Sequence, residues 1–413
     1  MIELLSPAGN LDRLKVAFEY GADAVYIGGH TMSMRAKAQN FSPDEMAEGI
    51  RYAHSIGRRV YVAVNICAHN ADFNGLEDYL VHLEKIGADA VLISDPGVFT
   101  LAQKVAPDLD IHISTQANVT NYASAAFWRD MGAKRFVAAR ELSLAEIAEI
   151  RKKTPNIEIE AFVHGAMCMA YSGRCLISNF LNERDANRGE CAQPCRFNYN
   201  VTEEKTGEVF PILEDAHGTY IFNSKDLCMI NHLDDLIAAG VTSLKIEGRM
   251  KTEYYVGAVT KIYREALDDF FTDPEQYKKK APHYSAELEK IGNRGYTTGF
   301  FYGKNPGHDY TGEKQTTNQD FLALAESYDP HTGLANVEQR NKFQKGDSIE
   351  ILRATRPNFT QTVDYMHNED GEEITSAPHP KQKIYLRLNE PVAKHDMIRK
   401  VTASKKMNNF IHG

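Results

Sequence analysis

The chain lacks the segments that direct a protein into or across a membrane. None of its apolar runs is long enough to span a bilayer, and the opening MIELLSPAGNLDRL has neither the basic start nor the long apolar stretch of a signal peptide. An excess of positive charge is also missing, since 47 Lys and Arg face 56 Asp and Glu among 413 residues. The net charge of −9 does not indicate a general nucleic-acid-binding protein. We therefore expect a cytoplasmic protein with no membrane partner, whose thiols stay reduced.

Three short motifs of catalysis or cofactor binding are absent as well. The chain has no G-x-S-x-G nucleophile elbow, no H-E-x-x-H zinc helix and no glycine-rich dinucleotide fingerprint. The first two absences argue against the common serine and zinc peptidases. Cysteine-nucleophile chemistry stays open, because His164 precedes Cys168 by four residues and the two side chains would be within reach of each other.

A recurring phrase organises the first 250 residues. YGADAVYIG, IGADAVLIS, MGAKRFVAAR and AGVTSLKIEG begin at Tyr20, Ile86, Met131 and Ala239. Each phrase is typical of a helix end, a glycine at the C-terminal cap and a short buried strand. Strands that alternate with helices in this way predict a parallel sheet.

Eight strands of this kind can be counted. They are expected at 2–8, 23–29, 58–66, 89–95, 110–115, 134–140, 157–165 and 242–249. Eight parallel strands with intervening helices predict an α/β fold, a (β/α)8 TIM-type barrel. A doubly wound open sheet is the alternative, although the missing dinucleotide fingerprint does not favour it.

The domain organisation follows from where this pattern stops. We expect a catalytic barrel domain at 1–320, interrupted at 167–230 by a cysteine-rich segment and a β-hairpin with KTG and AHG turns. Helices are expected at 252–272 and 284–291. Short alternating strands then predict a small C-terminal β-barrel at 321–413, a candidate RNA-docking domain.

Strand alternation predicts an unusually polar barrel lumen. The predicted lumen-facing residues are Tyr61, Ala63, Asn65, His112, Ser114, Gln116, Glu158, Glu160, Phe162, His164, Ser243, Lys245, Glu247 and Arg249. Buried charges have to be paired or have to serve a ligand. Two interpretations stay open, an internal ion-pair network and a polar ligand site at the strand ends. The strand-end candidates are Asn65, Ser94, Gln116, Arg140, His164, Glu247 and Arg249, whereas Glu158 and Lys245 lie deeper and are interpreted as structural.

Four of the six cysteines lie within 32 residues, with the spacing Cys168-x6-Cys175-x15-Cys191-x3-Cys195. Four thiolates suit an iron–sulfur cluster or a tetrahedral zinc ion, and unligated thiols are a third alternative. Only the last pair has the tight spacing of a zinc site. Cys67 and Cys228 are far away in sequence and are interpreted as small buried hydrophobic residues.

Three longer stretches resemble a known family. EAFVHGAMCMAYSGRCLISNF, ELLSPAGNLDRLKVAFEYGADAVYIGG and SKDLCMINHLDDLIAAGVTSLKIEGRMKTEYYV are similar to blocks of the collagenase-like peptidase family U32. The resemblance covers nearly the whole chain. It implies either a peptidase, against which the missing protease motifs count, or an RNA-modifying enzyme of the family's hydroxylating branches.

For the tRNA-modifying branch, the resemblance implies prephenate-dependent hydroxylation of the wobble uridine to 5-hydroxyuridine. A sibling branch hydroxylates a cytidine of 23S rRNA. The resemblance also implies a four-cysteine iron–sulfur cluster, of the 4Fe-4S type, with prephenate as the co-substrate. Its ligands would be Cys168, Cys175, Cys191 and Cys195.

The remaining site residues are assigned by their chemistry. His164 is expected to move protons, with Glu247 and Arg249 as further catalytic candidates. The residues expected to bind a small dicarboxylate are Arg140, Arg174, Asn65 and Gln116, with Arg249 as another carboxylate fork.

The RNA partner would be the anticodon loop of a tRNA, whose unpaired bases can stack on aromatic side chains. Tyr171 and Tyr296 are candidate platforms, and packing in the core is the alternative for both. Lys278–Lys280 is either a phosphate contact or a solvated helix face.

Overall fold

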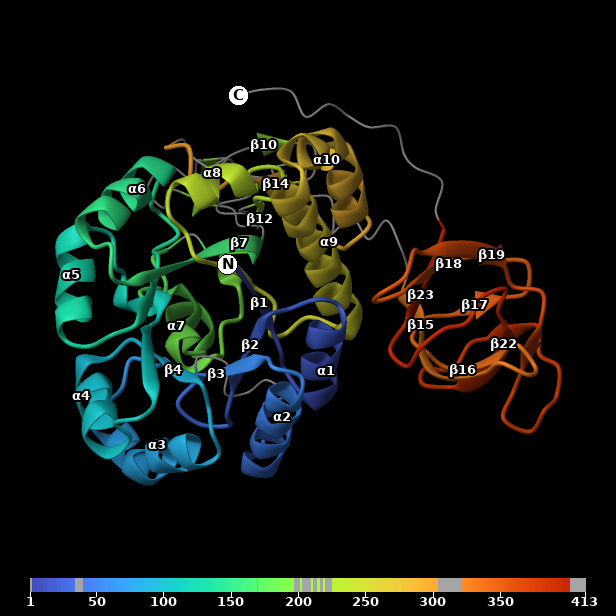
Figure 1. Cartoon of the computed structure of the whole chain (residues 1–413), viewed down its shortest axis with the longest axis horizontal. Coiled ribbons are helices and arrows are strands. Elements are labelled where there is room, and N and C mark those ends of the chain that lie inside the picture. The colour runs from blue at the N-terminus through green and yellow to red at the C-terminus, as the bar shows by residue number, and fades with distance from the viewer. Residues whose placement is uncertain are drawn as a thin grey trace. The chain divides into compact units, whose positions relative to one another are not determined.

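The structure is a computed structural model that consists of two compact units, Met1–Leu288 with Asn293–Gln315 and Glu289–Gly292 with Thr316–Gly413 (Figure 1). The described residues are 2–33, 40–168, 170–196, 201–202, 209–210, 214–215, 218–219, 225–303 and 321–401. None of the helices in these ranges combines the length and the apolar character needed to cross a membrane.

Eight parallel strands form a closed barrel in the first unit. They are β1 (Glu3–Pro7), β2 (Ala24–Gly28), β3 (Arg59–Val64), β4 (Ala90–Ile93), β5 (Asp110–Ile113), β6 (Arg135–Val137), β7 (Glu158–Ala166) and β13 (Ser243–Ile246). Each strand pairs with the next, and β13 pairs with both β1 and β7, which closes the ring. The predicted TIM-type barrel is confirmed. Each strand lies within its predicted range, except that β7 ends one residue later, at Ala166.

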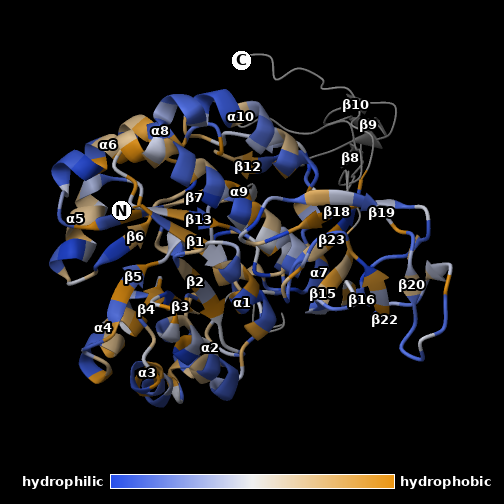
Figure 2. Ribbon diagram, turned by 45° about the vertical axis from the view of Figure 1, so that its right-hand side comes forward, coloured by the Kyte–Doolittle hydropathy of each residue, from blue (hydrophilic) through white to orange (hydrophobic). Residues whose placement is uncertain are grey.

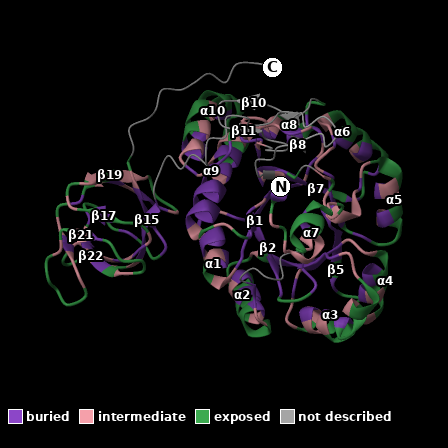
Figure 3. Cartoon of the chain, turned by 180° about the vertical axis from the view of Figure 1, so that it is seen from behind, coloured by how far each residue is buried: buried purple, intermediate pink, exposed green. Residues whose placement is uncertain are grey.

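The helices surround the strands, and their outer faces are exposed (Figure 3). They are α1 (Leu11–Glu19), α2 (Pro43–Ser55), α3 (Leu76–Lys85), α4 (Pro96–Val105), α5 (Tyr122–Asp130), α6 (Leu144–Lys153), α8 (Leu233–Ala238), α9 (Glu253–Thr272) and α10 (Pro274–Glu289). The glycine of each recurring phrase has a positive φ angle: 106° at Gly21, 81° at Gly87, 103° at Gly132 and 94° at Gly240. The recurring phrase is therefore the helix C-cap that its sequence predicts.

Helix α10 begins ten residues before its predicted start. Its interior contains Pro282, which removes a helical hydrogen bond and is unfavourable inside a helix. Asp269 at the end of α9 offsets this loss, because its carboxylate accepts hydrogen bonds from Gln276, Lys280 and the Tyr284 hydroxyl. Tertiary contacts with α9 therefore outweigh the local cost of the proline.

The deep part of the lumen holds a balanced ion cluster. Arg135 Nη1 lies 2.5 Å from Glu3 Oε1 and 3.1 Å from Glu160 Oε2, and Lys245 Nζ lies 2.6 Å from Glu160 Oε1. Tyr61 donates to Glu3 at 2.6 Å. Burial alone would raise the pKa of Glu3, but Arg135 brings it below the ordinary value. The ion-network interpretation therefore holds for this depth, including the structural role predicted for Lys245.

His164 does not face the lumen, although strand alternation predicts that it does. The pairing of β7 with β13 shifts register, since Lys245 pairs with Phe162 but Ile246 pairs with His164. The extra residue in β7 is a bulge that puts His164 on the same face as Ile246. Its ring lies among three tyrosines, Tyr255, Tyr263 and Tyr296, at centroid distances of 6.0, 5.6 and 5.4 Å.

The segment between β7 and β13 contains short elements. The cysteine-rich part has helix α7 (Ile177–Asn182) and the 3-10 turns η3 (Ala186–Arg188) and η4 (Pro194–Arg196). Two antiparallel pairs follow, β8 (Val201–Thr202) with β9 (Val209–Phe210) and β10 (Glu214–Asp215) with β11 (Gly218–Thr219). The predicted KTG turn lies outside the described residues. β12 (Asp226–Cys228) pairs antiparallel with the end of β7 and parallel with β14 (Tyr296–Thr297).

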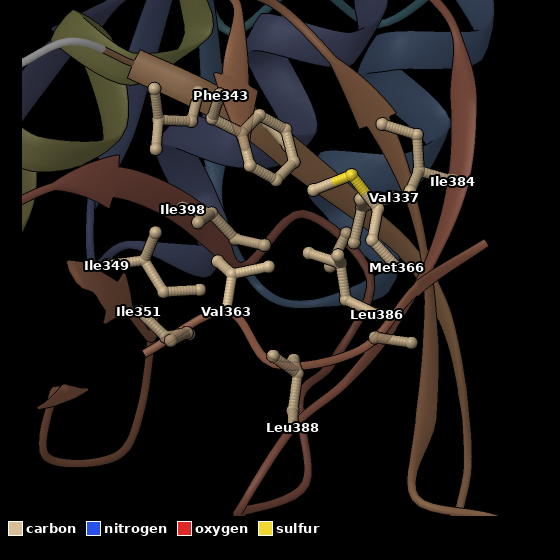
Figure 4. Packing of buried hydrophobic residues seen from close by; sticks show 14 of the residues in the cluster. Val337, Phe343, Ile349, Ile351, Val363, Met366, Ile384, Leu386, Leu388 and Ile398 are labelled. Carbon is tan, nitrogen blue, oxygen red and sulfur yellow. The ribbon is translucent and has the colours of Figure 1, made fainter. Parts of the chain in front are cut away.

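The second unit is an antiparallel sheet domain, which confirms its predicted all-β character. Its strands are β15 (Phe321–Asp329), β16 (Leu334–Gln339), β17 (Phe343–Gln344), β18 (Ser348–Leu352), β19 (Phe359–Thr362), β20 (Met366–His367), β21 (Ser376–Ala377), β22 (Lys383–Arg387) and β23 (Met397–Lys400). Branched apolar side chains and Phe343 pack together in its core (Figure 4). Burial alternates from residue to residue along strands such as β16 and β22, which are coloured by hydropathy in Figure 2. One face of the sheet is therefore buried.

The lumen cluster gives a stability prediction. Glu160→Gln should lower the free energy of unfolding of the barrel by about 3–5 kcal/mol, because it leaves the buried Lys245 ammonium without its carboxylate. The double variant Glu160→Leu with Lys245→Met should be more stable than the single one, as measured by urea denaturation. Glu48→Gln breaks an exposed ion pair with Lys15 and serves as the control, with an expected effect below about 1 kcal/mol. A single variant as stable as wild type would contradict a paired lumen.

The enclosure of His164 gives a pH prediction. Burial lowers the pKa of its imidazole from 6.5 to about 4, which Asp226 counteracts only in part. Because the unfolded chain binds the proton more tightly, stability from this group is complete above pH 6.5 and is lost as the pH falls towards 4. The loss should be on the order of 3 kcal/mol. His164→Gln should flatten this dependence in urea titrations, whereas His283→Gln, 55% exposed, should keep it. An equally steep dependence without His164 would exclude it as the cause.

Candidate active site at the barrel mouth

The carboxyl ends of the barrel strands carry two polar groups of residues. In the first, Asn65 Nδ2 donates to Ser114 Oγ and to Gln116 Oε1, both at 3.3 Å. Ser114 Oγ donates to Gln116 Oε1 at 2.5 Å, and Ser94 Oγ donates to the Asn65 carbonyl at 3.2 Å. The strand-end candidates of β3, β4 and β5 therefore lie together, as predicted.

Arg140 and Glu247 form the second group. Arg140 Nη1 donates to the Ala166 carbonyl at 2.7 Å, and its Nη2 lies 3.4 Å from Glu247 Oε2. The guanidinium also covers the ring of Phe162, with its carbon 3.9 Å from the ring centroid. These contacts hold the ends of β6, β7 and β13 together, and both charged side chains are mostly buried. Gly165, with φ 105°, allows this approach, because a Cβ there would lie 2.6 Å from the Glu247 carbonyl oxygen.

The cysteine module, which we define as residues 167–196, starts directly after β7 and lies against these strand ends. In Figures 1 and 3, α7 lies inside the ring of barrel helices. Gly173 packs on Gln116, and a Cβ at this glycine would lie 3.2 Å from the Gln116 side chain. Its φ of 72° also favours glycine. Asn118 Nδ2 donates to the Ser172 carbonyl at 3.4 Å, so this part of the module covers the Asn65–Gln116 side of the mouth.

A second set of bonds connects the module to the loop after β3. Arg188 forms a bidentate ion pair with Asp72, with Nη1–Oδ1 and Nη2–Oδ2 distances of 3.0 and 2.9 Å. These bonds lower the pKa of Asp72. Asn187 accepts from the Cys67 amide at 3.1 Å and donates to the Cys67 carbonyl at 3.4 Å. The polar NERDANRGE loop is therefore held by defined side-chain bonds.

Three of the four module cysteines lie around α7. Cys175 is half-buried two residues before the helix, and Cys195 is half-buried in η4, which contacts the helix. Ala192, next to the exposed Cys191, donates its amide to the buried Ser178 hydroxyl at 2.9 Å. The Cys191 sulfur accepts a hydrogen bond from the Gln193 amide at 3.4 Å.

The donor set therefore fits a thiolate-bound metal centre in its chemistry, since four free thiols lie on one short module. The positions of the side chains, however, do not form a complete metal site. Among the described residues, which include all four cysteines, no three His, Cys, Asp or Glu side chains converge as a metal site.

The other predicted site residues have different positions. Arg249 is buried and donates to Ser33 at 2.8 Å rather than to the Arg140 group. Arg174 is exposed beside Gly173, and its charge acts on the Cys67 thiol, whose pKa is raised overall by burial. His164 lies at the bulge, and its ring packs among three tyrosine rings instead of facing the lumen.

The aromatic and lysine candidates also separate. Tyr171 is 48% exposed on the module, whereas Tyr296 is half-buried and donates to the Leu288 carbonyl at 2.9 Å. These contacts favour the alternative interpretation of Tyr296, which is packing in the core. Lys278–Lys280 is an exposed face of α10. The prediction that Cys67 and Cys228 are buried hydrophobic residues is wrong, since both are half-buried and Cys67 anchors the module.

Sequence reasoning missed the contacts that dock the module. Asp72 and Arg188 are 116 residues apart, and Cys67 and Asn187 are 120 residues apart. No local spacing indicates such pairs. The only available signal was the density of polar residues in the NERDANRGE loop, residues 182–190, which has too few apolar side chains for a core of its own.

Comparisons with known proteins agree with this architecture. Residues 9–310 match Peptidase family U32, and residues 317–399 match the Peptidase family U32 C-terminal domain. The tRNA hydroxylation protein P1 of Bacillus subtilis (strain 168) is 40% identical over 401 residues, which cover 96% of this chain and 94% of that protein.

Two further relatives come from Escherichia coli (strain K12). Its tRNA hydroxylation protein P is 39% identical, with 93% of each chain covered. Its 23S rRNA 5-hydroxycytidine synthase is 38% identical over 65% of this chain and 39% of that protein. The family match over most of the length settles the classification: this chain belongs to peptidase family U32.

Proposed function

We propose that the protein is a tRNA-modifying enzyme that hydroxylates the wobble uridine to 5-hydroxyuridine in a prephenate-dependent reaction. The observation that supports this most is the docking of a four-thiol module on the polar mouth of the barrel, the end at which enzymes of this fold carry their active sites. Relatives named for tRNA hydroxylation match this chain over nearly its full length.

The module would hold an iron–sulfur cluster of the 4Fe-4S type through Cys168, Cys175, Cys191 and Cys195. Replacing the C5 hydrogen of uracil by a hydroxyl group removes two electrons from the base, and a bound cluster supplies redox chemistry for such a reaction. Holding a cluster would require the four sulfurs to move closer together than they are in this structure. The bonds from Arg188 to Asp72 and from Asn187 to Cys67 would keep the module in place during that movement.

Glu247 is the best-placed residue to move a proton at the mouth. Its carboxylate is mostly buried and lies 3.4 Å from Arg140 Nη2, at the end of the barrel where active sites of this fold lie. His164 is a weaker candidate, because its low pKa keeps the ring neutral and the tyrosines enclose it. We therefore assign proton transfer to Glu247 and a packing role to His164.

The cysteine module also offers a surface suited to unpaired bases. Five of its apolar side chains are exposed, from Ile177 at 37% to Phe180 at 91%; the others are Tyr171, Leu176 and Leu181. An exposed apolar patch of this kind marks an interaction site in soluble proteins. The bases of an anticodon loop are unpaired and stack on aromatic rings, so this patch would receive the loop beside the cluster.

Two alternatives have less support. The relative that acts on 23S rRNA shares 39% of its own length with this chain, whereas the tRNA relatives share more than 90% of theirs. The sequence has neither a G-x-S-x-G nor an H-E-x-x-H motif, which counts against a peptidase.

Loss of a single thiol should abolish the reaction. In a strain that depends on this protein for the modification, Cys191→Ala should reduce 5-hydroxyuridine and its derivatives in total tRNA at least tenfold, because a cluster with three thiolates is labile. Nucleoside mass spectrometry measures this directly. Cys228→Ala is the matched control, since Cys228 lies on β12 outside the module, and it should leave the modification intact. Normal 5-hydroxyuridine in the Cys191→Ala strain would reject the role of the thiols.

A further inference from the structure

Gln116 lies where the polar mouth of the barrel meets the cysteine module. It belongs to the 3-10 turn η2 (Thr115–Ala117), which begins two residues after the end of β5. Asn118 Nδ2 donates to the Gln116 carbonyl at 2.7 Å, which holds the main chain of this turn in place. The turn packs against Gly173 of the module, in the segment between Cys168 and Cys175. The Gln116 side chain is therefore next to the part of the module that carries the first two thiols.

Two of the three parts of this side chain are already occupied. Its aliphatic carbons Cβ and Cγ pack against Gly173, where an added Cβ would lie 3.2 Å from each of them. Its Oε1 accepts hydrogen bonds from Asn65 Nδ2 at 3.3 Å and from Ser114 Oγ at 2.5 Å. Among the described residues, Nε2 donates to no acceptor, and unlike Arg140 Nε it is not enclosed. The accessible part of the half-buried side chain is therefore the amide nitrogen.

The neighbouring side chains determine which end of the Gln116 amide stays open. Asn65 Nδ2 donates to Ser114 Oγ at 3.3 Å, and the Ser114 hydroxyl donates in turn to Gln116 Oε1. Two donors thus converge on one oxygen atom. Turning the amide over would place its own N–H groups against the N–H groups of Asn65, which cannot accept them. The mouth therefore presents a positioned hydrogen-bond donor beside the module.

A donor of this kind matches a neutral carbonyl group. The side chains that surround it, Asn65, Ser94 and Ser114, carry no charge, whereas a carboxylate binds most strongly to a cation. Uracil has a carbonyl group at C4, next to the C5 atom that the proposed reaction hydroxylates, and its O4 atom is an acceptor. Cytosine has an amino group at the same position, which is a donor. Because two donors that face each other both lose their partners, this site should reject cytosine.

We propose that Gln116 selects uracil over cytosine by donating a hydrogen bond from Nε2 to the C4 carbonyl oxygen. The inference rests on the proposed function, which identifies the modified base as uracil, and it adds the residue that distinguishes this base from cytosine. It assigns Gln116 to the base instead of to the dicarboxylate expected from the sequence. Asn65 and Ser114 hold the amide in the orientation that the selection requires.

The experiment compares two tRNAs that differ only in the wobble nucleotide, uridine in one and cytidine in the other. Each is expressed with the full-length chain in a strain that has no other source of the modification, and nucleoside mass spectrometry measures 5-hydroxyuridine and 5-hydroxycytidine. Gln116→Glu keeps the shape of the side chain and the oxygen that Asn65 and Ser114 bind, but replaces the donor by an acceptor. It should lower the ratio of uridine product to cytidine product at least about tenfold. Gln103→Glu introduces the same charge at an exposed position of α4 and should leave the ratio unchanged.

The outcomes separate this inference from the proposed function. An unchanged ratio in Gln116→Glu, at a wild-type melting temperature, would overturn the role of Gln116 and leave the proposed function intact. Equal loss of both products would also overturn it, because a residue that binds the acid or only supports the fold affects both bases alike. A wild-type chain that forms no 5-hydroxyuridine would reject the proposed function and this inference together.

A second variant keeps the test decisive if Gln116→Glu does not accumulate as a folded protein. Gln116→Met has a similar length and removes both polar atoms, so neither base is favoured. It should also lower the ratio of uridine product to cytidine product, and an unchanged ratio would overturn the assignment.

Discussion

The bidentate ion pair between Arg188 and Asp72 is the contact on which the candidate site depends. It joins a loop that has almost no apolar core of its own to the loop that follows β3. The two Asn187–Cys67 bonds, which connect the same two loops, fix the same approach. Because charge-assisted, paired bonds are directional, they determine which side of the module faces the mouth. The thiols and the exposed apolar side chains of the module acquire their positions from this docking.

Below the mouth, the lumen solves a different physical problem. Charges in a closed barrel must be neutralised internally, and the Glu3–Arg135–Glu160–Lys245 cluster does so with two acids and two bases. The ion-network interpretation therefore holds for the deep layer, and a ligand site at the strand ends stays a prediction. The cluster stabilises the deep layer, whereas the strand-end groups of Asn65 and Arg140 remain available at the mouth. The bulge in β7 marks the boundary, since it turns His164 away from the lumen and leaves Glu247 as the acidic group at the top.

Local rules predicted the barrel well. The recurring glycine phrase and the short apolar runs depend only on neighbouring residues, so the eight strands and their caps could be read from the sequence. What the sequence did not reveal are features that depend on distant partners. The bulge at His164 arises where the pairing of β7 with β13 shifts register. Helix α10 continues through Pro282 because Asp269 of α9 binds its side chains. The module docks through pairs of residues more than 100 positions apart. The four thiols were evident as donors, but the contacts that dock them were not, because each joins residues more than 100 positions apart.

The central claim is that the docked module holds iron through its four cysteine sulfurs. X-ray absorption at the iron edge of anaerobically purified protein tests it most directly. The account predicts about four iron atoms per chain, each surrounded by sulfur at the short distances of a cluster, and a loss of that signal in Cys191→Ala. Iron bound by nitrogen and oxygen, zinc in its place, or no metal at all would contradict it.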